Sequence, residues 1–187
     1  MVEFIATAEA IEDHRLIVWD PKEGSRLYAS GFYGKPLGIS KPKELVFDVP
    51  LILDLIEGVY LLEKGRIRVV AGPGGREMSV EELKEIAGRV HDRFDMKYRV
   101  YRDLREAGYV VTPGIKYGCD FAVYQHGPGI DHAPYIVQVK EPEEELPAAE
   151  IVKAGRLATT VRKTFIMAVV DEKSGGVTYL GFEWWKP

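Results

Sequence analysis

The chain has 187 residues, of which 46% are hydrophobic and 29% are charged. This length and composition support one large or two small globular domains and exclude a disordered or fibrous protein. The 25 basic and 29 acidic residues give a net charge of −4, so a polyanionic partner must bind a locally basic face.

The compartment follows from what the sequence lacks. No apolar run approaches the roughly 20 residues of a membrane span. The start, Met1-Val2-Glu3-Phe4, has no signal-peptide pattern, and a single cysteine, Cys119, excludes an intrachain disulfide. We therefore expect a cytoplasmic protein without a membrane segment. Since asparagine is absent and glutamine occurs only at Gln125 and Gln138, we also expect a thermophilic source.

The first half of the chain predicts a strand meander followed by helices. Short apolar or β-branched runs predict strands at residues 2–8, 15–19 and 26–33, with a turn at 21–24. Residues 34–43 hold two prolines and two glycines, which predict an exposed loop. The next elements expected are a strand at 45–47, a helix within 51–65 and a strand at 66–71. A capping box of Ser79 and Glu82 then begins a helix that ends near Val90.

Charge density rises over residues 91–98, where we place a domain boundary between residues 1–92 and 93–187. The next helix, at about 97–107, ends in a Gly108 cap. The elements expected after it are strands at 109–112, 120–125 and 134–139, a helix at 147–163, and strands at 165–170 and 176–184. The sequence therefore predicts a mixed α/β (α+β) protein with two domains.

Three separated blocks in the second half form one pattern. They are Tyr109-x-Val111-x-x-Gly114-x-Lys116-Tyr117-Gly118-x-Asp120-Phe121-x-Val123-Tyr124, then His132 ahead of the strand at 134–139, then Arg156-x-Ala158-x-x-Val161-Arg162-Lys163. Together they resemble the catalytic domain of the archaeal-type tRNA-splicing endonucleases, which cut introns out of precursor tRNA. The resemblance implies a small N-terminal α/β domain and a C-terminal restriction-endonuclease-like domain, with a mixed sheet flanked by helices.

The resemblance also implies a metal-independent endoribonuclease that cuts at bulge-helix-bulge sites. The ribose 2′-OH attacks the adjacent phosphorus and leaves a 2′,3′-cyclic phosphate and a 5′-OH end, so a base, an acid and a cation are needed. Tyr124, His132 and Lys163 take these roles in that order. A histidine pKa near 6.5 suits the acid, whereas a tyrosine pKa near 10 suits a base only if a cation such as Lys163 lowers it.

Four further basic residues are candidates for RNA binding. Arg156 precedes Lys163 by seven residues, about two helical turns, so both can point from one helix face. In the family, an arginine here helps to hold an extruded bulge base. Lys35, Lys41 and Lys43 lie in the loop at 34–43, which contains no acidic residue, and can contact phosphates without reading bases. An ordinary solvated surface is the alternative interpretation of all four.

The C-terminal segment predicts an assembly. Residues 176–185 form an apolar, aromatic strand, and an exposed edge of this kind pairs with another chain. The resemblance implies at least a dimer, either by self-association or as a two-plus-two heterotetramer with a structural subunit. It implies no cofactor and no metal.

Two alternatives remain open. The chain could be a non-catalytic frame subunit of the same complex, although such a subunit is expected to lose the three catalytic side chains that this sequence keeps. It could also be a magnesium-dependent, restriction-type nuclease that uses Asp120 and Lys140. In that case Gln138 would stand where a second carboxylate is expected, and a neutral amide is a weaker Mg²⁺ ligand.

Overall fold

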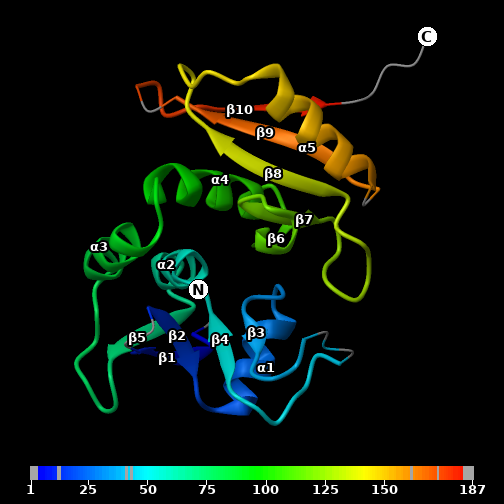
Figure 1. The fold of residues 1–187 in the computed structure, drawn as a ribbon. Coiled ribbons are helices and arrows are strands. Elements are labelled where there is room, and N and C mark those ends of the chain that lie inside the picture. The colour runs from blue at the N-terminus through cyan, green and yellow to red at the C-terminus, as the bar shows by residue number, and fades with distance from the viewer. Residues whose placement is uncertain are drawn as a thin grey trace. The chain divides into compact units, whose positions relative to one another are not determined.

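The computed structural model describes residues 4–11, 14–40, 42, 44–160, 162–171 and 173–182. The chain divides into two compact units, Met1–Tyr98 and Arg99–Pro187 (Figure 1). Each unit combines helices with one five-stranded mixed sheet, which confirms the predicted α+β class. Within the described residues, no helix is long and apolar enough to cross a membrane.

The sheet of the first unit has the strand order β3-β4-β2-β1-β5. Its strands are β1 (Ala6–Ile11), β2 (Arg15–Val18), β3 (Lys35–Pro36), β4 (Leu51–Leu53) and β5 (Ile67–Ala71). The helices are α1 (Pro21–Ala29), α2 (Leu55–Glu63), α3 (Val80–Val90) and α4 (Phe94–Glu106), which continues into the second unit. Strand β1 runs parallel to β5 and antiparallel to β2. The strands predicted at 15–19 and 66–71 and the helix begun by Ser79 are confirmed. The strand predicted at 2–8 is displaced, because β1 begins at Ala6 and continues to Ile11.

The predicted strand at residues 26–33 is wrong, because residues 26–29 belong to helix α1 and residues 30–33 form no strand. The Asp20 carboxylate accepts hydrogen bonds from the backbone N–H groups of Lys22 and Glu23, and Pro21 occupies the first turn. A proline there favours a helix start as well as a turn, since its fixed φ fits both. The apolar residues of the run then pack one face of α1 into the core, where Leu27 and Tyr28 are buried.

The predictions for residues 34–56 also need correction. Within the predicted exposed loop at 34–43, Lys35 and Pro36 form strand β3, and Pro36 is buried. Residues 51–53 form strand β4, not helix, and α2 begins only after Asp54, whose side chain forms a capping box with Glu57. Residues 45–47 form no strand. The Ser25 hydroxyl pairs with both the N–H and the carbonyl of Phe47, so these backbone groups are satisfied without a neighbouring strand.

The sheet of the second unit has the order β10-β9-β8-β7-β6. Its elements are β6 (Val110–Pro113), the 3₁₀ turn Ile115–Tyr117, β7 (Phe121–Tyr124), β8 (Tyr135–Lys140), α5 (Ala148–Thr160), β9 (Thr164–Val170) and β10 (Val177–Phe182). Strands β8 and β9 are parallel and the other pairs are antiparallel. Each strand and helix predicted for this half is present, with ends shifted by a few residues.

Helices cover both faces of this second sheet (Figure 1). On one face, Ala158 of α5 packs with Ile136, Phe165 and Met167 in a buried cluster. On the other face, the ring of Tyr101 from α4 lies 6.0 Å from that of Phe121. The parallel pair β8 and β9 needs a crossover connection, which α5 provides. The expected mixed sheet flanked by helices is confirmed.

Candidate active site

The three predicted catalytic residues lie at one end of the second sheet. Tyr124 is the last residue of β7, His132 shortly precedes β8, and Lys163 directly precedes β9. Because β7 is antiparallel to β8 and β9 is parallel to it, the end of β7 and the starts of β8 and β9 meet at the same edge. Three separated sequence blocks are thus brought together by strand direction alone.

Lys163 contacts residues from two other segments. Its half-buried ammonium group donates a hydrogen bond to the carbonyl oxygen of Ala133, the residue after His132. The same nitrogen lies 5.0 Å from the centroid of the Tyr117 ring. A lysine over an aromatic face is stabilised by the negative potential of the ring. Lys163 therefore has a fixed position beside the His132 segment.

The end of α5 sets the direction of Lys163. The Lys163 N–H donates to the carbonyl of Ala158 (2.8 Å), and the Arg162 N–H donates to that of Thr159 (3.1 Å). Arg162 has φ 54°, so the helix ends in a Schellman motif with arginine at the left-handed position. The prediction that the helix continues to residue 163 is wrong, and with it the argument that Arg156 and Lys163 share one helix face. Arg156 is exposed on α5.

A tight turn presents Tyr117 beneath Lys163. The carbonyl of Gly114 accepts hydrogen bonds from the N–H groups of Tyr117 (2.8 Å) and Cys119 (3.3 Å). A Cβ on Gly114 would lie 2.7 Å from the Cys119 carbonyl oxygen and 2.7 Å from the Phe121 nitrogen. Only glycine permits this approach, which explains in physical terms why the motif has glycine at 114.

The environment of Tyr124 favours its neutral form. Burial raises the pKa of its phenol, nearby Tyr117 and Asp131 raise it further, and a hydrogen bond with Thr112 only partly opposes them. The condition stated for a tyrosine base, a pKa lowered by Lys163, is therefore not met. Tyr124 offers a neutral hydroxyl, which can orient or relay a proton.

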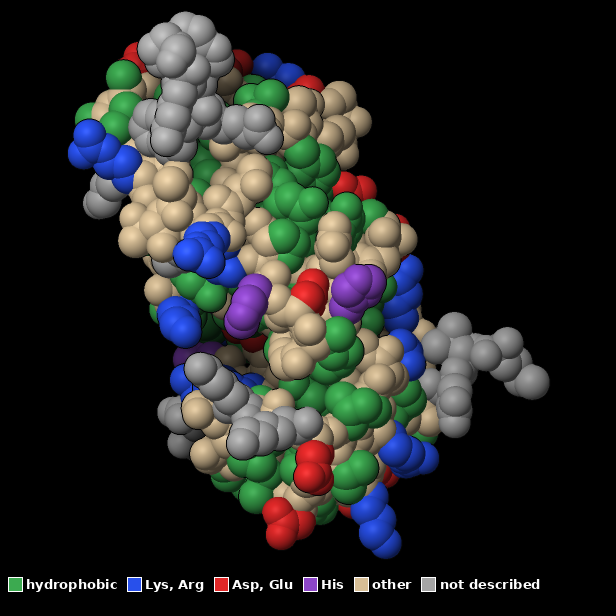
Figure 2. Space-filling model, turned by 90° about the vertical axis from the view of Figure 1, so that its right-hand side faces the viewer, with side chains coloured by type: hydrophobic (Ala, Val, Ile, Leu, Met, Phe, Trp, Pro, Cys, Tyr) green, Lys and Arg blue, Asp and Glu red, His purple; other side chains and the backbone are tan. Residues whose placement is uncertain are grey.

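His132 is exposed, which the role predicted for it requires. In the space-filling view of Figure 2, histidine side chains lie at the surface of the face that is turned toward the viewer. The residue before it, Asp131, was not singled out by the sequence analysis. Its carboxylate accepts hydrogen bonds from three backbone N–H groups of the preceding loop. An acidic residue two positions after the Gly127-Pro128-Gly129 turn and immediately before the histidine is the signal that could have indicated it.

The RNA-binding candidates are distributed over both units. Lys35 is exposed in β3 of the first unit, and Arg156 is exposed in the second. Lys41 and Lys43 lie outside the described residues.

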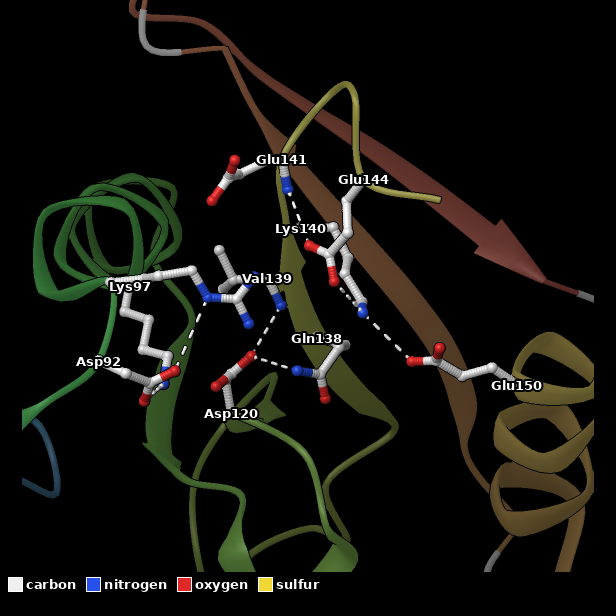
Figure 3. A network of polar contacts seen from close by, with 10 residues as sticks. Asp92, Lys97, Asp120, Gln138, Val139, Lys140, Glu141, Glu144 and Glu150 are labelled. Atoms are coloured by element: carbon white, nitrogen blue, oxygen red, sulfur yellow. Dashed lines mark hydrogen bonds and ion pairs between the residues drawn. The ribbon is translucent and has the colours of Figure 1, made fainter. Parts of the chain in front are cut away.

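The residues of the magnesium alternative are committed to other contacts (Figure 3). Asp120 Oδ2 accepts hydrogen bonds from Gln138 Nε2 and the Val139 N–H, both at 2.8 Å. Lys140 is buried, and its ammonium nitrogen lies 2.5 Å from Glu144 and 3.2 Å from Glu150. Across the described parts of the chain, no three His, Cys, Asp or Glu side chains are grouped to hold a metal ion. Asp120 is thus held by hydrogen bonds from amide groups, and Lys140 by two ion pairs, which are contacts of a structural kind.

Comparison with known proteins assigns both halves of the chain to one family. The family description "tRNA intron endonuclease, N-terminal domain" matches residues 8–84, and "tRNA intron endonuclease, catalytic C-terminal domain" matches residues 94–179. A tRNA-splicing endonuclease of Hyperthermus butylicus is 51% identical over 92% of this chain and 95% of its own length. One of Saccharolobus islandicus is 44% identical over 92% of this chain and 94% of its own length. The chain therefore belongs to the tRNA intron endonuclease family, a family of endoribonucleases that act on precursor tRNA.

Proposed function

We propose that this chain is a catalytic subunit that excises introns from precursor tRNA at bulge-helix-bulge sites without a metal ion. The 2′-oxygen loses its proton and bonds to the adjacent phosphorus. The bond from phosphorus to the 5′-oxygen breaks, and that oxygen takes up a proton. The products are a 2′,3′-cyclic phosphate and a 5′-OH end.

The observation that carries this proposal is the convergence of Tyr124, His132 and Lys163 at one end of the sheet. The exposed imidazole of His132 donates the proton to the leaving 5′-oxygen. Lys163 stabilises charge on the phosphorane oxygens. The carbonyl of Ala133 engages one of the three ammonium N–H donors of Lys163, which leaves two for the phosphate. Tyr124, held as a neutral phenol, orients the 2′-hydroxyl, and the proton of that hydroxyl passes to solvent water as the 2′-oxygen bonds to phosphorus.

Cleavage of a bulge-containing RNA in excess EDTA tests the chemistry. We expect wild-type cleavage to persist and its products to carry 2′,3′-cyclic phosphate and 5′-OH ends. Tyr124→Phe should slow cleavage but leave measurable activity, because the ring that packs in the site is retained. Strict dependence on Mg²⁺, together with sensitivity to Asp120→Asn, would support the restriction-type alternative instead.

We propose that Arg156, Lys35, Lys41 and Lys43 contact the RNA. In the triple variant Lys35→Ala/Lys41→Ala/Lys43→Ala, we expect weaker RNA binding and a salt dependence flatter by up to about three phosphate contacts. Arg156→Ala should impair substrates with an extruded bulge base more than continuous duplexes. An unchanged salt slope in the triple variant would show that these lysines are ordinary surface residues.

We propose that the chain works in an assembly, as a two-plus-two complex with a structural subunit or as a self-associated dimer. Strand β10 is an edge strand of the sheet, and Leu180 within it is 46% exposed. An unpaired, apolar edge is a template for pairing with another strand. Light scattering of the chain alone and with a candidate partner tests this. A monomer that is active at nanomolar concentration would contradict it, and cleavage by the complex that is independent of the three catalytic residues would indicate a frame subunit.

A further inference from the structure

The loop between Tyr124 and His132 is organised around one side chain. Asp131 Oδ1 accepts a hydrogen bond from the Gly127 N–H at 2.8 Å. Its Oδ2 accepts from the N–H groups of Gln125 at 3.1 Å and His126 at 3.2 Å. These three donors and the carboxylate form what we call the Asp131 clamp.

The clamp joins the two candidate catalytic residues at either end of the loop. Gln125, one of the donors, directly follows Tyr124, while Asp131 directly precedes His132. Both oxygens of the carboxylate are engaged from the same short stretch of backbone. Movement of the loop would therefore break several hydrogen bonds together.

Backbone contacts support the loop less extensively. The N–H groups of Ile130 and Asp131 both donate to the Gly127 carbonyl at 3.1 Å. Gly127 has φ 135° and Gly129 has φ 89°, conformations that glycine adopts readily but that do not by themselves hold a loop in one shape. Without the carboxylate, the three N–H groups of the clamp would lose their shared acceptor, and water or a looser arrangement would replace it.

Asp131 is suited to this task because it remains charged. Burial alone would raise the pKa of its carboxyl, but the N–H donors of Gly127, His126 and Gln125 outweigh burial and lower it. A carboxylate that accepts backbone N–H groups makes charge-assisted hydrogen bonds, which are roughly twice as strong as neutral ones.

We propose that Asp131 is a positioning residue for the cleavage reaction, which holds the His132 imidazole where the leaving 5′-oxygen will be and fixes its separation from Tyr124. This inference rests on the proposed function, because it takes His132 to be the general acid. A displacement of about 1 Å in such a group can cost on the order of a hundredfold in rate. Asp131 itself contacts backbone, so its effect on the reaction passes through His132.

Two RNA substrates distinguish this positioning role from a general loss of structure. One is the ordinary RNA, and the other has sulfur in place of the 5′-bridging oxygen at the cleavage site. A thiolate leaves without a proton, so the second substrate does not need a general acid. In Asp131→Asn, an amide group replaces one oxygen and brings N–H donors against the N–H donors of the clamp.

We expect Asp131→Asn to cleave the ordinary RNA about 10- to 100-fold more slowly than wild type in single-turnover assays at saturating enzyme. On the sulfur substrate, most of this loss should disappear, as it should for His132→Ala. The dissociation constant for uncleaved RNA should change little, because no phosphate contact is removed. Asp131→Glu, which keeps the charge and moves it by one methylene, should lie between wild type and Asp131→Asn.

Asp20→Asn is the matched control, since Asp20 also accepts two backbone N–H groups, those of Lys22 and Glu23, but in the first unit. It should cleave both substrates at the wild-type rate. The proposal is overturned if Asp131→Asn and Asp131→Glu cleave the ordinary RNA at the wild-type rate, or lose equally on both substrates. If the sulfur substrate fails to restore cleavage by His132→Ala, the assignment of His132 as the acid is itself wrong. If it restores cleavage by His132→Ala while the Asp131 variants cleave the ordinary RNA at the wild-type rate, only the inference about Asp131 fails.

Discussion

The ammonium nitrogen of Lys163 lies 5.0 Å from the centroid of the Tyr117 ring. The two residues come from different blocks of the sequence. Tyr117 lies in the turn before β7, and Lys163 follows the cap of α5. The hydrogen bond from Lys163 to Ala133 supplies a second constraint. The lysine that we assign to charge stabilisation is thereby held between an aromatic face and the backbone beside His132.

Replacement of the Tyr117 ring should weaken catalysis through Lys163. Tyr117→Leu removes a cation–π contact worth about 0.5 to 2 kcal/mol, and we expect the single-turnover cleavage rate to fall by about two- to thirtyfold. Tyr117→Phe keeps the ring face and should cleave at close to the wild-type rate. If the two variants lose activity equally, the hydroxyl of Tyr117, and not its ring, is the important group.

Gly114→Ala should destabilise the second unit. The added methyl would lie 2.7 Å from the Cys119 carbonyl oxygen and the Phe121 nitrogen, which are backbone atoms that cannot easily move aside. We expect a loss of about 1 to 3 kcal/mol in the free energy of unfolding, typical of overpacking. Gly88→Ala is the control, because Gly88 lies in α3 with open space around a Cβ. Alanine should be neutral or stabilising there, and a similar loss in both variants would refute the steric explanation.

Arg162→Gly should stabilise the chain. Arg162 has φ 54° at the C-terminal cap of α5, a conformation that costs a non-glycine residue roughly 1 to 2 kcal/mol. Glycine removes this strain at some cost in the entropy of the unfolded state, so we expect a net gain of about 0.5 to 1 kcal/mol in urea denaturation. Because the cap hydrogen bond of Lys163 uses backbone atoms, cleavage should stay within about threefold of wild type. A lower unfolding free energy would show that the Arg162 side chain itself stabilises the cap.

Asp131 should contribute stability that depends on pH. Its pKa is lowered in the folded state, so its contribution is present above the ordinary aspartate pKa of about 3.9 and is lost as the pH falls through the lower folded value. The unfolding free energy of wild type should therefore exceed that of Asp131→Asn at pH 7, and the difference should shrink in strong acid. A difference that stays constant from pH 7 to pH 2 would contradict a role for the charge.

The second unit was predictable because its signals agree with one another. Strand, turn and helix patterns coincide there, and the family motif anchors them, so β6 to β10 and α5 appear where the sequence indicates. In the first unit, Pro21 suited both a turn and a helix start, and β-branched or apolar residues alone did not separate strand from helix. The three-residue strand β4 is too short for its period to be recognised before α2 begins.

The sequence was enough to predict the residue types of the candidate site, but not the hydrogen bonds that hold those residues in place. Tyr124, His132 and Lys163 were found by motif, whereas the Asp131 clamp depends on backbone groups that the sequence does not display. The direction of the Tyr124 pKa shift could not be predicted for the same reason: burial and neighbouring Tyr117 raise the pKa, and burial is a property of the fold. The boundary near residue 92 and the roles of the basic residues remain predictions.

The most direct test of the account is a double-mutant cycle on His132 and Lys163, with single-turnover cleavage measured in EDTA at saturating enzyme. We predict that His132→Ala and Lys163→Ala each slow cleavage by about 10² to 10⁴, with little change in RNA affinity. Because both groups act on one phosphate in one transition state, the double variant should be much less impaired than the product of the two losses. Single variants within about threefold of wild type, or losses that appear equally in RNA binding, would contradict the account.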